Sequence, residues 1–114
     1  MKYMEVSFAS DRLKKTCESV SERKRRFGEP TAGKLKTRLD DLDAAHSMED
    51  MRNLPGHWEE LKGDRRGQFS CRLAGGLRLI VRPRRQPART RPDGGLDWRA
   101  VDQVTVVDVL DYHD

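Results

Sequence analysis

Apolar and polar residues alternate strictly at the start of the chain. The apolar positions of this alternation are Met4, Val6 and Phe8. A period of two predicts a short, half-buried strand. After Ser10 or Asp11, either of which can cap a helix, the period lengthens, and one helix is predicted to run to a stop at Gly28. The apolar positions that share one face of this helix are Leu13, Cys17, Val20 and Phe27.

A second helix is predicted after Pro30, because proline lacks an N–H group and the first turn of a helix does not need one. The apolar positions on its inner face are Ala32, Leu35, Leu39 and Leu42. The connection to the preceding helix is tight, which predicts an antiparallel helical pair. Ser47 can cap one more helical turn over residues 47–51, and residues 53–56 have the composition of a turn.

From Trp58 onward the apolar period returns to two, and residues 58–62 are predicted to form a strand. The alternating apolar positions of the next two strands are Phe69, Cys71 and Leu73, then Leu77, Leu79 and Val81. Residues 104–110 are almost continuously apolar, which predicts a central strand covered on both faces. A strand, two antiparallel helices and a mainly antiparallel sheet together predict an α+β fold with the helices on one face.

The glycine pair between residues 69–73 and 77–81 predicts a β-hairpin with a definite register. If the loop consists of residues 74–76, with a glycine at positive φ, the apolar residues face one another across the hairpin. The pairs are then Leu73 with Leu77, Cys71 with Leu79, and Phe69 with Val81. A two-residue loop would instead set Leu73 opposite Arg78 and mix buried with polar positions. The core pattern therefore selects the three-residue loop.

The same register places Arg72 opposite Arg78 on the other face of the hairpin. Like charges directly opposite each other destabilise a sheet by up to about 1 kcal/mol. An anion between them would relieve this cost, and the planar guanidinium suits phosphate. Two interpretations stay open: a phosphate-binding pair, or two solvated arginines whose side chains diverge. Ile80 lies on the same face, so part of that face must be covered.

The length, charge and cysteine content of the chain limit the classes of function that it can have. The chain has 114 residues, which suits a single domain, and its formal net charge of +4 favours a polyanionic partner. There is no apolar stretch of about 18 residues that would predict a membrane span, and the first residues lack the apolar segment of a signal peptide. Cys17 and Cys71 lie in apolar patterns without metal-ligand spacing, which indicates buried, reduced thiols in a cytoplasmic protein.

Residues 82–99 contain six arginines, three prolines and two glycines. This composition predicts a long, exposed loop rather than a regular element. Clustered arginines bind polyanions without sequence preference, so this loop is a candidate RNA-contacting surface. The basic run at residues 22–27 is interpreted either as the solvated end of a helix or as a second surface of this kind.

Residues on the hairpin and at the end of the chain resemble the motifs of the RelE/HigB-like toxins of bacterial toxin–antitoxin pairs, often called plasmid-maintenance killer proteins. The residues that carry the resemblance are Leu61, Lys62, Gly63, Gly67, Ser70, Arg72, Arg78, Asp111, Tyr112 and His113. Residues 42–56 are also similar to the passage from helix to sheet in this family. The resemblance covers most of the chain, and residues 82–102 look like an exposed hairpin insertion that compact members lack.

The resemblance implies one RelE-like, microbial-RNase-type domain over residues 1–114. It implies a ribosome-dependent endoribonuclease that cleaves messenger RNA and inhibits translation, without a metal or cofactor. The implied partners are the ribosome, messenger RNA and a small helix-turn-helix antitoxin of the HigA-like kind, which neutralises the toxin in a hetero-oligomer in the cytoplasm. No membrane partner is implied.

Metal-free RNA cleavage uses the 2′-hydroxyl as nucleophile, so other groups must accept its proton, stabilise the phosphate and protonate the leaving oxygen. The catalytic candidates are Lys62, Arg72, Arg78, Tyr112 and His113. The cations fit charge stabilisation, although Lys62 alone would be an ordinary solvated lysine. The imidazole of His113 fits proton transfer near neutral pH, unless it belongs to a frayed tail. Tyr112 stacks on a base, donates its hydroxyl or packs as an ordinary strand residue.

Four further residues are candidates for contacts with the substrate, and they are Asp111, His57, Arg84 and Arg85. Asp111 either orients His113 or simply ends the last strand. His57 follows a Pro-Gly turn and faces either RNA or the solvent beside a packed Trp58. The two arginines belong to the basic loop.

The chain departs from the family pattern at one position. Some relatives carry a histidine just before the Leu-Lys-Gly motif, whereas Glu59 stands there in this chain and His57 is two residues away. This departure supports a second hypothesis, a catalytically weak module of the same fold that binds RNA, the ribosome or an antitoxin. A basic DNA-binding protein is a third and weaker hypothesis, because no helix-turn-helix signature is present.

Overall fold

The structure of the protein is a computed structural model, and it describes residues 2–111. Its helices and strands are β1 (Glu5–Phe8), α1 (Asp11–Glu18), α2 (Val20–Phe27), α3 (Thr31–Ala44), β2 (Glu59–Glu60), β3 (Phe69–Arg72), β4 (Leu77–Pro83) and β5 (Gln103–Asp111). The connections also contain short 3₁₀ helices, which are η1 (Met48–Asn53), η2 (Gly63–Arg65) and η3 (Trp98–Ala100).

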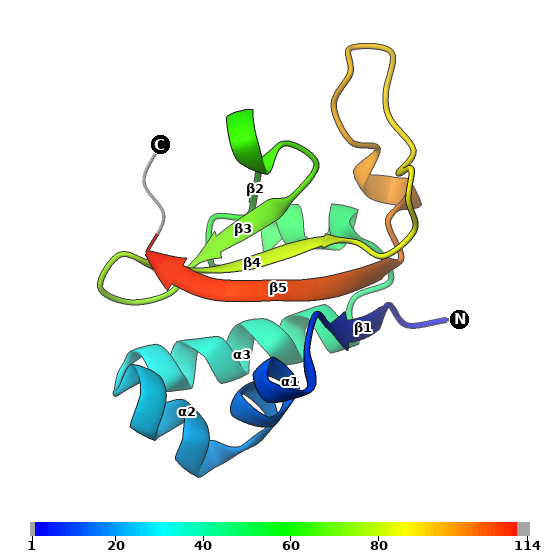
Figure 1. The fold of residues 1–114 in the computed structure, drawn as a ribbon. Coiled ribbons are helices and arrows are strands. Elements are labelled where there is room, and N and C mark those ends of the chain that lie inside the picture. The colour runs from blue at the N-terminus through cyan, green and yellow to red at the C-terminus, as the bar shows by residue number, and fades with distance from the viewer. Residues whose placement is uncertain (1, 112–114) are drawn as a thin grey trace.

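The strands form one sheet in the order β1-β5-β4-β3-β2, in which β1 runs parallel to β5 and the other neighbours are antiparallel. The helices α1, α2 and α3 lie against one face of this sheet (Figure 1). β5 lies between β1 and β4, so the predicted central position of this strand is confirmed. The predicted α+β class, with an N-terminal strand and a mainly antiparallel sheet, is confirmed as well.

The core lies between the sheet and α3. Its fully buried side chains include Leu35 and Leu42 of α3, Phe69 of β3, Leu79 of β4 and Val106 of β5. Burying a side chain of this kind stabilises the folded state by about 1.5–3 kcal/mol. The β3–β4 hairpin is therefore held against the helical layer by its apolar face, and Arg72 and Arg78 lie on its other face.

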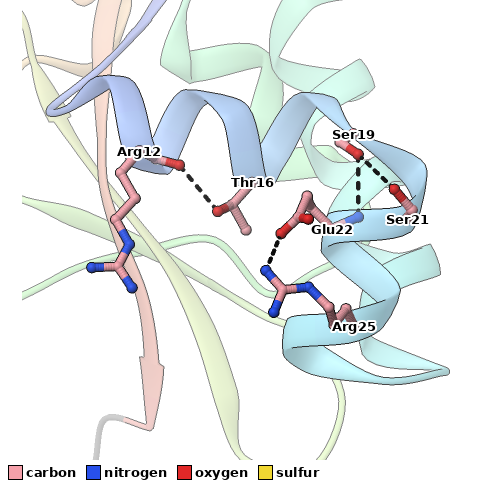
Figure 2. A network of polar contacts seen from close by, with 6 residues as sticks. All are labelled: Arg12, Thr16, Ser19, Ser21, Glu22 and Arg25. Carbon is pink, nitrogen blue, oxygen red and sulfur yellow. Dashed lines mark hydrogen bonds and ion pairs between the residues drawn. The ribbon is translucent and has the colours of Figure 1, made fainter.

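The single helix predicted up to residue 27 is wrong, because the chain breaks at Ser19 into α1 and α2. Ser19 is extended, with φ −105° and ψ 126°, and its Oγ accepts a hydrogen bond from the backbone N–H of Glu22 at 3.2 Å (Figure 2). A serine hydroxyl competes in this way with helical hydrogen bonding. The break turns Val20 away from the core, and this residue is 59% exposed to solvent. α2 does end before Gly28, whose φ of +68° favours glycine and whose N–H donates a hydrogen bond to the carbonyl oxygen of Lys24.

The basic run at residues 22–27 is only partly solvated. Arg25 is exposed and pairs with Glu22 at 2.5 Å (Figure 2). Arg23, in contrast, is buried, and its Nη1 donates a hydrogen bond to the carbonyl oxygen of Cys17 at 2.6 Å. This carbonyl lies in the last turn of α1, where helical partners are missing. Arg23 therefore joins α1 to α2 and is structural.

The helical turn predicted over residues 47–51 is present as η1, but Ser47 does not cap it through its side chain. The carboxylate of Asp50 accepts a hydrogen bond from the backbone N–H of His46 at 2.8 Å instead. The carboxylate thus reaches back over the start of the turn, where backbone N–H groups lack helical partners.

The loop predicted over residues 82–99 is not exposed throughout. Its outgoing arm is exposed at Arg85, but its returning arm buries Leu96 and Trp98, which are 5% and 4% exposed. The Trp98 ring packs edge-on against Phe69, with ring centroids 4.8 Å apart. Burial of the large apolar area of Trp98 determines the position of this arm, and the flanking arginines remain in solvent.

No helix within the described part of the chain has both the length and the apolar character that crossing a membrane requires. The longest of the α-helices named above, α3, has 14 residues, whereas a span needs about 20.

Both cysteines are buried and free, as the apolar pattern predicts. Burial raises the pKa of the Cys71 thiol to about 12 and that of Cys17 to about 11, from an ordinary value of 9.0. We expect both thiols to react with a thiol reagent at pH 8 far more slowly in the folded protein than in urea. Stability should fall as pH rises from about 9 towards 12, because the thiols ionise in the unfolded chain first.

The matched control is Lys34→Cys, which adds an exposed thiol that should react at once in the folded protein. Equal reaction rates for all thiols in the folded and unfolded protein would contradict the buried positions of Cys17 and Cys71.

Candidate functional site

The candidate site is built on the β3–β4 hairpin, whose predicted register is confirmed. Arg72 pairs with Arg78 across the two strands. The next pair is joined by a hydrogen bond from the Leu73 N–H to the Leu77 carbonyl at 2.9 Å. Hydrogen-bonded and non-hydrogen-bonded pairs alternate, so Arg72 and Arg78 form a non-hydrogen-bonded pair, in which Cα atoms are only about 4.5 Å apart. The two guanidinium groups therefore start from closely spaced points on one face.

The hairpin turn allows this register because Gly75 and Gly76 have φ values of +62° and +84°. Side chains rarely adopt such values, so glycine is the residue that the turn requires. Beyond the turn, the Arg72 N–H donates to the carbonyl oxygen of Gly56 at 2.6 Å. This bond continues the pairing along the outer edge of β3 and brings residues 56–59 alongside the arginine pair.

Glu59 is the residue that completes the site. It pairs with Ser70 across β2 and β3, and Ser70 lies two residues from Arg72, so Glu59 shares the face of the arginines. Its Oε1 accepts a hydrogen bond from Nη1 of Arg78 at 2.7 Å. Its Oε2 lies 3.7 Å from Nε2 of His57. One carboxylate thus lies between an arginine and an imidazole.

The side chains of the site differ in how far they are exposed to solvent. Arg78 is 17% exposed and Glu59 34%, whereas His57 is 60% exposed. Arg72 is exposed, and it makes no hydrogen bond or ion pair with another side chain within residues 2–111. Arg78 is therefore held in place by Glu59, and Arg72 is the cation that stands open to a ligand.

Apolar burial beneath the site explains its rigidity. Ile80 and Leu61 are buried at 0% and 3% exposure, yet both lie outside the main core cluster. Ile80 shares the face of Arg78, so this face is partly covered, as the sequence requires. Ser70 lies between Glu59 and Ile80 in the sheet, and its buried hydroxyl has no hydrogen-bond partner within residues 2–111.

Lys62 lies just beyond β2, which is shorter than the predicted strand at residues 58–62. It lines a pocket of about 540 Å³ together with Glu60 and Trp98. Glu59 also contributes to the wall of this pocket. Lys62 thus shares a pocket wall with Glu59, whereas Arg72 and Arg78 do not line this pocket.

Asp111 ends β5 and pairs with Leu77, one position along from the pair of Leu110 with Arg78. Neighbouring positions of a strand point to opposite faces, so Asp111 and Arg78 lie on different faces of the sheet. The Asp111 carboxylate approaches the hairpin turn, 3.5 Å from where a Cβ would stand on Gly76. The candidates Tyr112 and His113 lie outside the described residues.

Arg84 and Arg85 lie at the far end of the hairpin from the arginine pair. β4 runs from Leu77 to Pro83, so six strand positions separate Arg84 from Arg78, a span of roughly 20 Å. The loop projects from this end of β4, opposite the β3–β4 turn (Figure 1). The structure thus does not bring these two arginines together with the other candidates.

Metal-ligating side chains do not cluster in the described part of the chain. Within residues 2–111 there is no group of three or more His, Cys, Asp or Glu side chains placed to hold a metal ion. The charged groups that the site does offer are guanidinium, carboxylate and imidazole groups, which bind anions and move protons.

Comparisons with known proteins identify a shared fold. No protein-family model matches the chain, and no curated protein matches it. A solved structure described as a YoeB/ParE toxin from Agrobacterium tumefaciens matches with a TM-score of 0.57 and 14% sequence identity, over 96% of this chain and 100% of that one. The RelE-like fold that the sequence resemblance implies is therefore confirmed.

Glu59 was not predicted to belong to the site, because in the sequence it stands out only as a departure from the family pattern. The available signal was an acidic residue one strand away from two opposed arginines. That signal becomes readable only when β2 is known to pair with β3 through Glu59 and Ser70.

Replacing Arg72 by glutamate is expected to stabilise the protein by about 0.5–1 kcal/mol at low salt, because it removes a like-charge pair and places a carboxylate opposite Arg78. Urea denaturation at low and high salt measures this difference. The control is Arg99→Glu, which changes the net charge equally at an exposed position in η3. An equal effect of the two substitutions would contradict local repulsion between Arg72 and Arg78.

Proposed function

We propose that the protein is the toxin of a toxin–antitoxin pair and that it cleaves messenger RNA on the ribosome. The observation that carries this proposal is the cluster of Arg72, Arg78 and Glu59 on one face of the hairpin. The two cations can stabilise negative charge on the phosphate, and the carboxylate can accept the proton of the 2′-hydroxyl. The shared fold with a toxin supports the same class of function.

Glu59 is the proposed general base. In the reaction the 2′-oxygen attacks the neighbouring phosphorus, loses its proton to the carboxylate, and forms a cyclic phosphate while the bond to the 5′-oxygen breaks. The ion pair with Arg78 fixes the position of the carboxylate on the arginine face. Arg72 and Arg78 stabilise the negative charge that grows on the phosphate oxygens.

His113 is the proposed general acid, which protonates the departing 5′-oxygen near neutral pH. It stands two residues after Asp111 in the chain, and two residues span at most about 7 Å. The last strand, β5, contains the pair of Leu110 with Arg78 one position before Asp111. Tyr112 stacks on a base or donates its hydroxyl, and Asp111 orients the end of the chain.

The remaining candidates take supporting roles. Lys62 and His57 adjoin the site through Glu59 and contact the RNA on either side of the cleaved linkage. Arg84 and Arg85 contact ribosomal RNA at the far end of the sheet. The proposed regulator is a small helix-turn-helix antitoxin of the HigA-like kind, which forms a hetero-oligomer with the toxin in the cytoplasm.

A second candidate function is a binding module of the same fold with weak catalysis. The observation in its favour is the ion pair of Arg78 with Glu59, which occupies an arginine that an active site would use on phosphate. In that case the hairpin docks RNA or a partner without cleaving it.

Expression from an inducible promoter in a bacterium that lacks the antitoxin separates these functions. We expect growth arrest and new 5′ ends in messenger RNA, and we expect Arg78→Ala, Glu59→Gln and His113→Ala to lower cleavage by about 100-fold or more. Arg99→Ala serves as the matched control, because it removes a charge outside the site. Mapping the 5′ ends by sequencing gives the measurement.

Normal growth with folded wild-type protein would rule out the nuclease and favour the binding module. Full toxicity of the folded Arg78→Ala and Glu59→Gln proteins would show that the site is assigned wrongly.

The basic loop is expected to contribute salt-dependent affinity for the ribosome. Changing the four loop arginines Arg84, Arg85, Arg89 and Arg91 to glutamine should weaken co-sedimentation with ribosomes and reduce its salt slope by up to about 3. The control changes four exposed cations of the helical layer, which are Arg12, Lys14, Lys15 and Lys34. If the salt slope of the loop variant is unchanged, or if the control loses as much ribosome affinity as the loop variant, the loop is not part of the ribosome-binding surface.

A further inference from the structure

The pocket beside Glu59 has a composition that the cleavage chemistry does not explain. It has a volume of about 540 Å³, within the range of small-molecule sites. It lies at the outer edge of β2, between η1 and the returning arm of the loop at residues 84–102. The side chains that give it its character are Arg52, Trp58, Glu60, Lys62 and Trp98. Both tryptophans of the chain are therefore in its wall.

Arg52 forms a flat, fixed surface in this pocket. Its guanidinium carbon lies 3.9 Å from the centre of the Trp98 ring. Its Nε is held by the carboxylate of Glu49 at 2.9 Å, and the side chain is still 41% exposed. The guanidinium lies over the indole ring, and the exposed part of the Arg52 side chain is available for stacking on a ligand. Arginine planes of this kind stack on nucleobases.

Glu60 supplies hydrogen-bond acceptors at a fixed position. Its Oε1 accepts from Nε1 of Trp98 at 3.1 Å, and its Oε2 accepts from the backbone N–H of Leu96 at 2.9 Å. A carboxylate has about four acceptor positions, so each oxygen retains one for a ligand. Because two neutral donors hold it, Glu60 presents this acceptor edge in one orientation.

The pocket also contains donors without partners. Lys62 is exposed, and its side chain makes no hydrogen bond or ion pair within residues 2–111. Trp58 is buried, and its Nε1 likewise has no partner in this part of the chain. Fixing the loop to the sheet requires Trp98, Leu96 and Glu60, but it uses neither of these donors. A ligand with a flat ring, N–H donors and an anionic group would match what remains.

We propose that this pocket binds one nucleotide with a guanine base. The base would stack on Arg52 and donate its N–H groups to Glu60, and Lys62 would meet the phosphate. This inference rests on the proposed function in one respect: the shared wall at Glu59 makes the bound nucleotide a neighbour of the cleaved linkage, so the pocket selects where RNA is cut. Uracil presents carbonyl oxygens beside its only N–H group and is disfavoured by the carboxylate.

The test is a binding titration of the purified protein that needs neither the ribosome nor cleavage. The chain has 2 tryptophans, so its indole N–H groups give two NMR signals, and both report on the pocket. Guanosine 5′-monophosphate, uridine 5′-monophosphate and inorganic phosphate are the three probes. We expect the guanosine nucleotide to shift both signals at a concentration about tenfold lower than the uridine nucleotide does, and phosphate to leave them unmoved.

Two variants locate the contacts. Arg52→Met removes the stacking plane, and Lys62→Gln removes the free cation, and each should weaken guanosine nucleotide binding by about tenfold. Lys34→Gln is the matched control on an exposed position of α3 and should bind as the wild type does. If Arg52→Met fails to fold, the result for Lys62→Gln alone decides, because the Lys62 side chain has no partner within residues 2–111 to lose.

The outcomes of this test distinguish a failure of the guanine-pocket proposal from a failure of the proposed nuclease function. Equal shifts with both nucleotides, or none, would overturn the guanine pocket even if the protein cleaves RNA. Selective guanosine binding in a protein that cleaves nothing would uphold the pocket and reject the proposed nuclease. Selective binding that Lys62→Gln and Arg52→Met leave unchanged would place the nucleotide elsewhere and overturn the proposal.

Discussion

The cross-strand pairing of Arg72 with Arg78 is the constraint on which the site depends. The core imposes it, because only this register buries the apolar residues of both strands together, and a slip of one residue would turn them to solvent. The free-energy cost of two opposed cations is small compared with the stabilisation from burying Phe69 and Leu79. The packing of the core therefore determines the register of the two strands. The result is a preformed site of positive charge that no local preference of the arginines would create.

β2 connects this site to the adjoining pocket, although it is only two residues long. Neighbouring strand residues point to opposite faces, so Glu59 joins Arg78 while Glu60 binds the returning arm through Leu96 and Trp98. The position of the long loop and the charge of the arginine face thus depend on adjacent carboxylates of one short strand. Movement of β2 would change both regions at once.

The fold could be predicted from the sequence where the signal was local. Alternation of apolar residues and the glycine pair at residues 75–76 specified the hairpin, and its register followed from burial alone. The break at Ser19 could not be predicted, because apolar positions continue across it and only the serine hydroxyl opposes the helix. The positions of Glu59 and the buried Trp98 depend on contacts between residues distant in sequence. The arginines near Trp98 also made the segment around it too polar to predict as buried.

The proposed function requires Arg72 and Arg78 to hold one RNA phosphate together. NMR of the arginine Nε–H signals during titration with a short RNA, made uncleavable by 2′-O-methyl groups, tests it directly. We expect both signals to shift together and to saturate at the same RNA concentration, while the signal of Arg99 stays in place. Shifts at Arg99 or Arg84 with the signals of Arg72 and Arg78 unmoved would contradict it.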